Sequence, residues 1–397
     1  MSYFDLTLAR KTLNLTQLQA AELVQVEQAT WHQWETRKRK MRDTYWELFC
    51  LKTGYTEAKE KQAPFSKYTA REINSSGEDL ADLTHKVAQQ NAASKRFSYI
   101  DLFAGVGGIK KAFQTKESAC VFSSEIDPFA RHTYYANYGL VPYGDICTLN
   151  PEKIPDHDIL CGGFPCQPFS HIGKREGFSH PTQGTMYDEI LKIIDLKSPR
   201  VVFLENVPGI TSHDGGRTLE VVLNELDRRG YSCNYKILNA SDFGIPQMRK
   251  RFYLVCFKQS VDFKFPTPPM TTSNIGDFVE ESAKGYSISK HLQKSYLYKV
   301  NDGRPNVIDK STKGSIKTLV STYHKIQRLT GTFVADGETG MRLLTENECK
   351  AIMGFPSDFH FPVSRTQMYR QMGNSVVIKV VEEIAKEIYS SLSQLGR

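Results

Sequence analysis

The chain has 397 residues, of which 40% are hydrophobic and 24% charged, so it can bury a large core and has room for two or three domains. This composition excludes a disordered tail, a collagen-like fibre and a small disulfide scaffold. Because the sequence has no apolar run of membrane-spanning length and no signal-peptide pattern at its start, we expect a cytoplasmic protein that makes no membrane contact.

The eight cysteines are scattered without CxxC pairs, which predicts neither a metal site nor a disulfide framework. The net charge is +7, and the positive residues concentrate in two places. Residues 37–42 hold five Lys or Arg in six positions, and residues 284–330 hold ten against two Asp. An isolated basic run is usually a solvated face, but two such runs favour nucleic acid binding.

Residues 1–56 are predicted to form short helices. Thr16 and Gln19 have the spacing of a capping box, and a second helix is expected from Gln28 to Glu35. The pattern resembles the helix-turn-helix of phage-repressor-like DNA-binding domains, in which the second helix enters the major groove. It departs from that pattern at Gln25, where such domains usually carry Gly, and at Glu27, where they carry Ser. A helical hairpin packed on the rest of the protein is the alternative.

If these residues do form a helix-turn-helix, DNA contacts are expected from the second helix and the basic run after it. His32 and Gln33 would point toward base edges, and Arg37, Lys38 and Arg39 would lie near phosphates. The following polar residues, 57–97, are interpreted as a linker containing a short helix.

From residue 98 to 257, apolar runs alternate with helical segments, which predicts a doubly wound α/β sheet with its ligand sites beyond the carboxyl ends of the strands. Strands are expected within 98–103, 120–127, 157–163, 201–207 and 247–255, and helices within 107–113, 128–138, 189–196 and 218–230. Residues 258–362 interrupt this rhythm and are predicted to be an inserted small domain. Residues 363–397 end in an apolar helical stripe that is predicted to pack back onto the sheet and complete its domain.

Residues 100–113 predict a strand, a sharp turn at Gly105 and Gly107, and a helix. Glu125 follows the next strand, where an acidic side chain can accept both hydroxyls of a ribose. Asp145 is expected to close a third strand and to lie near an adenine. The glycine spacing is not G-x-G-x-x-G, so an adenosine without a pyrophosphate is favoured over a dinucleotide. A tight turn without a ligand is the alternative.

Residues 158–170 predict a strand followed by a rigid loop that displays Cys166 between two prolines. A thiol at the end of a central strand is a candidate nucleophile. Cys161, still inside the strand, is expected in the core. Glu205 ends another apolar strand and is a candidate general acid if burial raises its pKa, although a helix cap or a surface carboxylate is the alternative.

Gln247, Arg249 and Arg251 alternate, so they are expected on one face of a strand. Two arginines on one face suit a phosphate or an anionic intermediate, and a salt-bridged structural pair is the alternative.

Together these segments resemble the DNA (cytosine-5)-methyltransferases, in an order that covers residues 98 to about 392. The motifs that carry the resemblance are DLFAGVGG, SSEID, YGDI, CGGFPCQPFS, ENVPG, QMRKR, RLLTENECKAIMGFP and RQMGNSVV.

The resemblance implies an S-adenosylmethionine-dependent methyltransferase fold, a doubly wound mixed sheet with an inserted target-recognition domain. It implies catalytic roles for Cys166 as nucleophile, Glu205 as acid, and Arg249 and Arg251 beside the target base, with Gln247 on DNA. The cofactor residues that it implies are Phe103, Gly105, Gly107, Glu125, Ile126, Asp145, Ile146, Gly163, Asn374 and Ser375. Target recognition is expected from residues 258–340.

The implied function is methylation of carbon 5 of a flipped-out cytosine in double-stranded DNA, in a type II restriction-modification system that protects DNA from a cognate endonuclease. CCGG is the expected site and CCNGG the alternative. A tRNA methyltransferase is disfavoured by the long basic insert, and a purely regulatory protein would not need the catalytic residues. The N-terminal domain could bind the operator of its own promoter as a dimer, with catalysis performed by a monomer.

Overall fold

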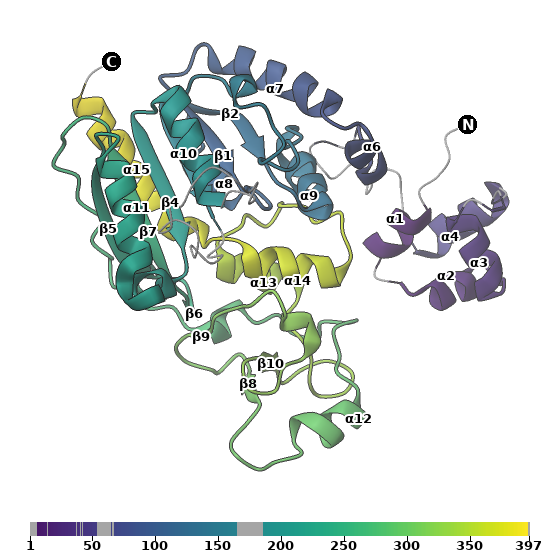
Figure 1. Ribbon diagram of the computed structural model, residues 1–397. Coiled ribbons are helices and arrows are strands. Elements are labelled where there is room, and N and C mark those ends of the chain that lie inside the picture. Colours follow the sequence, from purple (N-terminus) through teal and green to yellow (C-terminus); the bar gives the residue numbers. More distant parts are fainter. Residues whose placement is uncertain are drawn as a thin grey trace.

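The computed structural model describes residues 6–13, 15–36, 38–39, 41, 43–53, 65, 67–164 and 186–395. In this part of the chain, no helix is both long and apolar enough to cross a membrane. The chain forms an N-terminal helical bundle, a central sheet covered by helices, and a smaller region below that sheet (Figure 1).

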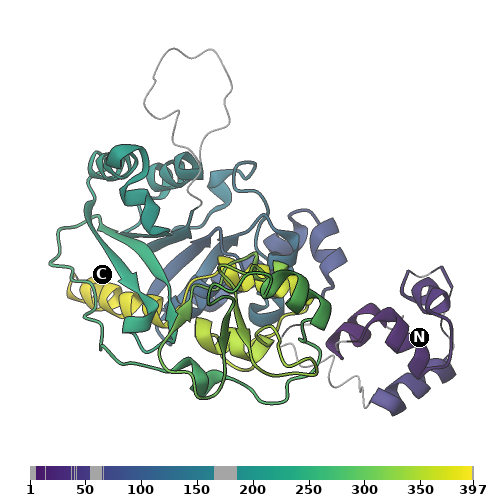
Figure 2. The same cartoon turned by 90° about the horizontal axis from the view of Figure 1, so that it is seen from below.

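The N-terminal bundle has its own core. Its helices are α1 (Leu6–Thr12), α2 (Gln17–Leu23), α3 (Gln28–Glu35) and α4 (Asp43–Thr53). A cluster that includes Trp31, Trp34 and Phe49 is buried among them and is separate from the two larger clusters of the sheet region. The bundle stands at one side of the molecule (Figure 2).

The turn between α2 and α3 shows how the sequence specifies this bundle. The capping box of Thr16 and Gln19 is present, and α3 has the predicted bounds. Gln25 adopts the left-handed conformation with φ 57°, while Val26 N donates to Ala21 O at 3.0 Å. This is the bonding of a Schellman turn, in which Gly is the usual residue. The departure at Gln25 therefore leaves the turn intact, and Glu27 begins α3 without a side-chain cap.

The residues interpreted as a linker are partly structured. They form α6 (Ala70–Ser75) and α7 (Asp79–Ala92), and α7 packs against the edge strand of the sheet. Ala81 and His85 of α7 are buried there, so this helix belongs to the sheet region and not to a solvated tether.

The central sheet is mixed, with strand order β2-β1-β3-β4-β7-β5. Pairing is parallel among the first four strands of this order, whereas β7 is antiparallel to both β4 and β5. The strands are β1 (Phe97–Leu102), β2 (Ser118–Ser124), β3 (Ile159–Gly163), β4 (Val201–Asn206), β5 (Ser232–Asn239) and β7 (Lys250–Phe257). This confirms the predicted doubly wound mixed sheet.

One expectation about the strands was wrong, and one strand was missed. The third strand, expected to close at Asp145, is reduced to a single bridge between Ser124 and Tyr143. The edge strand β5 was not predicted, because most of its residues are exposed or half-buried and it carries no continuous apolar run.

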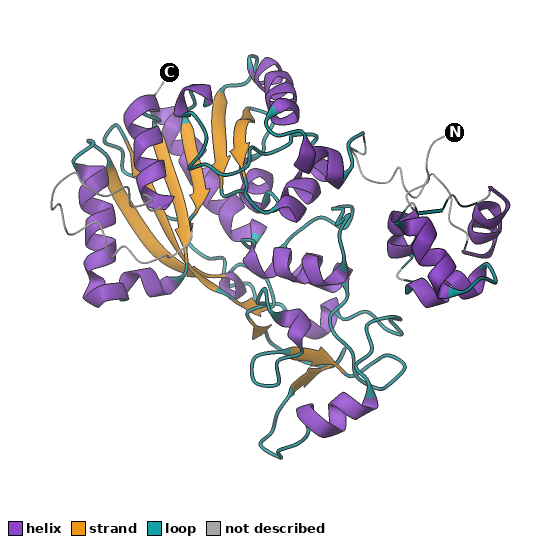
Figure 3. Cartoon of the chain, turned by 45° about the vertical axis from the view of Figure 1, so that its right-hand side comes forward, coloured by secondary structure: helices purple, strands orange, loops and turns teal. Residues whose placement is uncertain are grey.

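Helices cover both faces of the sheet (Figure 3). One face packs against α8 (Gly108–Phe113) and α15 (Ile378–Gln394), and the other against α10 (Met186–Lys197) and α11 (Arg217–Asp227). Alternate strand residues divide accordingly: Tyr99 and Phe203 face the first layer, whereas Ile100 and Leu204 face the second. Helix α9 (Pro128–Tyr138) has the predicted bounds.

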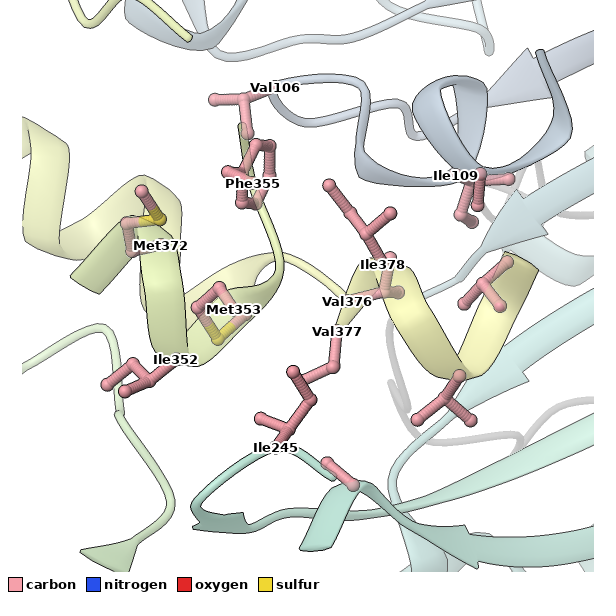
Figure 4. Close-up of a cluster of buried hydrophobic side chains, with 14 of the residues drawn as sticks. Val106, Ile109, Ile245, Ile352, Met353, Phe355, Met372, Val376, Val377 and Ile378 are labelled. Atoms are coloured by element: carbon pink, nitrogen blue, oxygen red, sulfur yellow. The ribbon is translucent and has the colours of Figure 1, made fainter. Parts of the chain in front are cut away.

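The inserted region joins the sheet through one continuous core. Its elements are α12 (Lys290–Leu292), β8 (Asn306–Ile308), β9 (Ile316–Lys317), β10 (Thr332–Val334) and α13 (Glu346–Met353). Strand β6 (Gln247–Met248) precedes this region and pairs with β9, and α14 (Arg365–Asn374) follows it. Met353 of α13 and Met372 of α14 belong to the same buried cluster as Val377 and Ile378, where α15 begins, and Figure 4 shows Met353 between Met372 and Val377.

Cys233 and Cys256 form a disulfide between β5 and β7, where they are directly paired. The sequence predicted no such bond, because cross-strand pairing cannot be deduced from scattered cysteines. Among the described cysteines, Cys120, Cys161 and Cys349 are free and buried, and Cys147 is free and exposed.

Candidate active site

The carboxyl ends of β1, β3 and β4 lie side by side, because Leu102 pairs with Gly162 and Gly162 with Leu204. The residues that follow these strands are therefore brought to one edge of the sheet, as the sequence predicts for a ligand site.

The glycine-rich loop leaves β1 at Phe103, whose φ is 54°. At Gly107, with φ 82°, a Cβ would come within 2.4 Å of a ring carbon of Tyr138, so only glycine fits. At Gly105 a Cβ would meet nothing within 4 Å, so space lies open beside this part of the loop.

Glu125 holds this loop in place. Its Oε2 accepts a hydrogen bond from Gly105 N at 2.7 Å, and its Oε1 accepts one from Asp127 N at 2.7 Å. Burial raises the pKa of Glu125, and the two N–H donors oppose that rise. Each carboxylate oxygen keeps a second lone pair, which can accept a hydroxyl hydrogen.

Ile126, Asp145 and Ile146 extend the same edge. The Ile126 side chain is 68% exposed, which is unusual for a large apolar residue. Asp145 follows the bridge at Tyr143 and accepts a hydrogen bond from Cys147 N at 3.0 Å, while Ile146 is buried.

One of the two C-terminal residues predicted to bind the cofactor, Ser375, also lies next to the glycine-rich loop. Ser375 caps the end of α14, and a Cβ on Gly108 would lie 2.6 Å from its Oγ. Val376 belongs to the same buried cluster as Val106 and Ile109, and Figure 4 shows Val106 beside Phe355. Asn374, the last residue of α14, is exposed.

These residues fit a nucleoside cofactor. The open space at Gly105 leaves room beside the loop, Glu125 supplies acceptors for ribose hydroxyls, and Ile126 presents an apolar surface on which an adenine ring can lie. The absence of a G-x-G-x-x-G spacing is consistent with a cofactor that has no pyrophosphate.

A second group of polar side chains lies at the end of β4. Glu205 Oε1 lies 3.0 Å from Arg251 Nε, across the antiparallel pair of β4 and β7. Both side chains are mostly buried, 13% and 15% exposed. Burial raises the pKa of Glu205, although Arg251 and then Arg249 oppose that rise.

Gly163 ends β3 directly opposite Glu205. A Cβ at Gly163 would lie 3.4 Å from Glu205 Oε2, so the absence of a side chain leaves the carboxylate room. Sequence reasoning missed Asn206, whose amide donates to Phe164 O at 3.0 Å and so ties β4 to the last described residue before the Cys166 loop. Its position directly after Glu205, at the end of the same strand, could have marked it as a residue of the site.

Arg249 has different partners from Arg251. Its guanidinium donates to the carbonyls of Leu319, Gly373 and Ser375 and is 2% exposed. Burial lowers the pKa of Arg249 to about 9, which leaves it charged at neutral pH. The two arginines thus do not form one matched pair: Arg251 contacts the carboxylate and Arg249 joins the inserted region to the end of α14.

Gln247 requires a correction. It was expected on DNA, but its side chain is 0% exposed, accepts from Leu319 N at 2.8 Å and donates to Ile352 O at 2.8 Å. The cause is the pairing of β6 with β9, a contact distant in sequence that turns this side chain into the core.

The predicted nucleophile, Cys166, lies outside the described residues. The N-terminal candidates lie in the separate bundle: His32 and Gln33 are exposed on α3, and Lys38 and Arg39 are exposed after it. Arg37 lies outside the described residues.

Comparison with known proteins gives the family. Residues 97–390 match C-5 cytosine-specific DNA methylase. The chain is 56% identical to Type II methyltransferase M.MspI of Moraxella sp over 401 residues, covering 99% of this chain and 96% of that protein. It is 50% identical to Type II methyltransferase M.BsuFI of Bacillus subtilis, over 75% of this chain and 73% of that protein.

Among solved structures, the Dnmt2 methyltransferase of S. pombe matches with a TM-score of 0.60 and 22% identity, covering 76% of this chain and 100% of that one. This likeness shows the fold. The chain belongs to the C-5 cytosine-specific DNA methylase family, and its methyl donor is S-adenosylmethionine.

Proposed function

We propose that this protein is the modification enzyme of a type II restriction-modification system, acting on double-stranded DNA in the cytoplasm and protecting it from a cognate endonuclease. Two relatives with 50% identity or more carry the name Type II methyltransferase, and one of them covers nearly the whole chain. The observation that carries the proposal is the Glu205–Arg251 pair at the sheet edge that also holds the cofactor residues.

Carbon 5 of cytosine is a poor nucleophile, because its electrons belong to the conjugated ring. In the proposed mechanism the Cys166 thiolate adds to carbon 6 while Glu205 donates a proton or hydrogen bond to nitrogen 3. The raised pKa of Glu205 suits this role because it favours the protonated carboxyl. Arg251 holds the carboxyl in position.

S-adenosylmethionine, when bound, supplies a methyl group on a positively charged sulfur to the activated carbon 5. Phe103, Gly105, Glu125, Asp145 and Ser375 would hold it, as the open loop and the free acceptor capacity of Glu125 support. A base then removes the proton from carbon 5, and Cys166 leaves carbon 6 by elimination. A stacked base cannot be reached above and below its ring, so the cytosine must be flipped out of the duplex.

Target recognition is assigned to residues 258–340, which carry the larger basic excess. Several aromatic and apolar side chains are exposed there: Tyr296, Tyr298, Val300 and Leu329. Such side chains beside lysines suit contacts with bases and phosphates. The resemblance of this region to the recognition regions of type II modification enzymes that act on CCGG favours CCGG as the target, with CCNGG as the alternative. Its length disfavours a tRNA substrate.

The N-terminal bundle is assigned a regulatory role: binding of its own operator as a dimer, with a monomer sufficient for catalysis. Its separate core and the exposed His32, Gln33, Lys38 and Arg39 support this. The residues matched by the methylase family begin only at residue 97, beyond the bundle.

Bisulfite sequencing of DNA and tRNA from cells that express the protein tests the proposal. In DNA, cytosines that resist bisulfite conversion are expected only within CCGG. Resistant cytosines at CCNGG would mean that CCNGG is the target. Resistant cytosines found only in tRNA would show that DNA is not the substrate. The same experiment with Cys166→Ala is the control and should show no protection.

A further inference from the structure

Helix α7 (Asp79–Ala92) precedes the residues that match the methylase family, yet it packs on β2, the edge strand of the sheet. In Figure 1 it runs along the outer side of β2. No role for this helix follows from the methyltransferase motifs, because all of those begin after it.

Three hydrogen bonds join α7 to the end of β2 and to the segment from Val141 to Tyr143. His85 Nε2 accepts a hydrogen bond from Ser123 N at 3.0 Å, and Thr84 Oγ1 accepts one from Val141 N at 3.1 Å. The hydroxyl of Tyr143 donates to the carboxylate of Asp82.

His85 is suited to accept a hydrogen bond. It is 1% exposed, and burial lowers its pKa to about 4, so the ring is neutral at physiological pH. Its Nδ1 lies 2.7 Å from Ala81 O and donates there, which leaves the lone pair of Nε2 for Ser123 N. The ring also contacts Tyr143, with centroids 4.7 Å apart.

The two segments that α7 holds are those that carry the acidic cofactor residues. Ser123 lies two residues before Glu125, and Tyr143 two residues before Asp145. They are joined to each other as well, since Tyr143 N donates to Ser123 O at 2.9 Å and Glu125 N to Tyr143 O at 2.8 Å.

The segment around Tyr143 has few backbone hydrogen bonds to the sheet. A full strand would fix the segment around Tyr143 by a ladder of hydrogen bonds, but only one bridge is formed there. Side chains of α7 occupy the outer side of β2, where another strand could otherwise pair.

We propose that α7 sets the affinity for S-adenosylmethionine, with Asp82, Thr84 and His85 acting as positioning residues for Glu125 and Asp145. The inference rests on the proposed cofactor site. It makes cofactor binding depend on a helix outside the residues that the methylase family matches.

The test compares Thr84→Val with Thr84→Ser in the full-length protein. Valine keeps the shape but removes the acceptor for Val141 N, whereas serine keeps it. S-adenosylhomocysteine binding is measured by calorimetry. The Kd should rise roughly ten-fold for Thr84→Val, the scale of one lost hydrogen bond, and return toward the wild-type value for Thr84→Ser. The kcat at saturating cofactor should be unchanged.

Two further variants keep the test decisive if Thr84→Val folds poorly. Tyr143→Phe removes only the hydroxyl that reaches Asp82 and should also raise the Kd with kcat unchanged. Leu83→Ala, at a side chain 49% exposed on the same helix, is the matched control and should bind normally.

Glu125→Ala tests the cofactor site independently of α7. If it binds S-adenosylhomocysteine normally, the cofactor site itself is misassigned. If Glu125→Ala loses binding while Thr84→Val and Tyr143→Phe keep the wild-type Kd, or lose only thermal stability, then α7 is structural and the inference is overturned.

Discussion

Arg251 Nε lies 3.0 Å from Glu205 Oε1, across the antiparallel pair of β4 and β7 at the candidate active site. The arginine opposes the effect of burial on this carboxyl, so the two residues together determine how much of Glu205 is protonated at neutral pH.

Replacing Glu205 by Gln should slow methyl transfer by about 10²-fold, because an amide keeps the shape but cannot deliver a proton. Single-turnover transfer from radiolabelled S-adenosylmethionine measures this. Binding of S-adenosylhomocysteine should be unchanged. Glu220→Gln, on the exposed side of α11, is the control. Near wild-type transfer by the Glu205 variant would exclude it as the acid.

Replacing Arg251 by Met should change the pH profile of the reaction. An acid acts while protonated, so the rate is lost as pH rises through the pKa of Glu205. Arg251 lowers that pKa, hence its removal should raise the pKa and move the alkaline limb of the single-turnover profile to higher pH. Arg217→Met, on an exposed ion pair, should leave the limb in place. A limb that moves to lower pH would contradict the assignment.

Many strands and helices of the sheet region could be predicted, because the sequence patterns that start and end them are local. For α9, Asp127 caps the start, Pro128 occupies the first turn and Gly139 ends the helix, and predicted and observed bounds agree. Edge strand β5 lacks such signals, since most of its side chains face solvent.

The chemistry of the candidate site was harder to predict where it depends on pairing between distant segments. Spacing placed Gln247, Arg249 and Arg251 on one strand face. It could not reveal that β6 pairs with β9, which buries Gln247, or that three carbonyls engage Arg249. Nor could it reveal that the helix expected within residues 57–97 packs on β2.

Cys166→Ala should abolish covalent trapping of the protein on DNA that carries 5-fluorocytosine in the target, because fluorine cannot leave as the proton does. Cys161→Ala should still be trapped. Cys161 is 0% exposed, and burial raises the pKa of its thiol well above the usual range, so it is unreactive. Denaturing gel electrophoresis detects the adduct. An adduct formed by the Cys166 variant would show that another residue is the nucleophile.

Gln25→Gly should raise the free energy of unfolding of residues 1–56 by about 0.5–1 kcal/mol, because Gln25 holds a left-handed conformation that glycine adopts without steric cost. Urea unfolding of that fragment, followed by circular dichroism, gives the value. Gln33→Gly, at an exposed position inside α3, is the control and should lower it by about 1 kcal/mol. Equal losses for both variants would mean that the turn has another geometry in solution.

Removing residues 1–60 should leave methylation of the target largely intact, because every proposed catalytic and cofactor residue lies later in the chain. The shortened protein keeps Phe65, whose N donates to Ala136 O at 3.2 Å, and it keeps α7. Removing residues 1–92 should instead weaken S-adenosylhomocysteine binding. Methylation assays and calorimetry on the two truncations distinguish these outcomes.

The separated residues 1–56 should bind a dyad-symmetric site near the protein's own promoter, since helix-turn-helix domains read paired half-sites about one helical turn apart. Binding should weaken steeply with salt if Lys38 and Arg39 contact phosphates. Ala at His32 or Gln33 should reduce discrimination between operator and random DNA in gel-shift assays, while the full-length variants keep their methylation rate. If the first truncation unfolds the protein or stops methylation, the bundle is a structural part of the enzyme and the regulatory assignment is wrong.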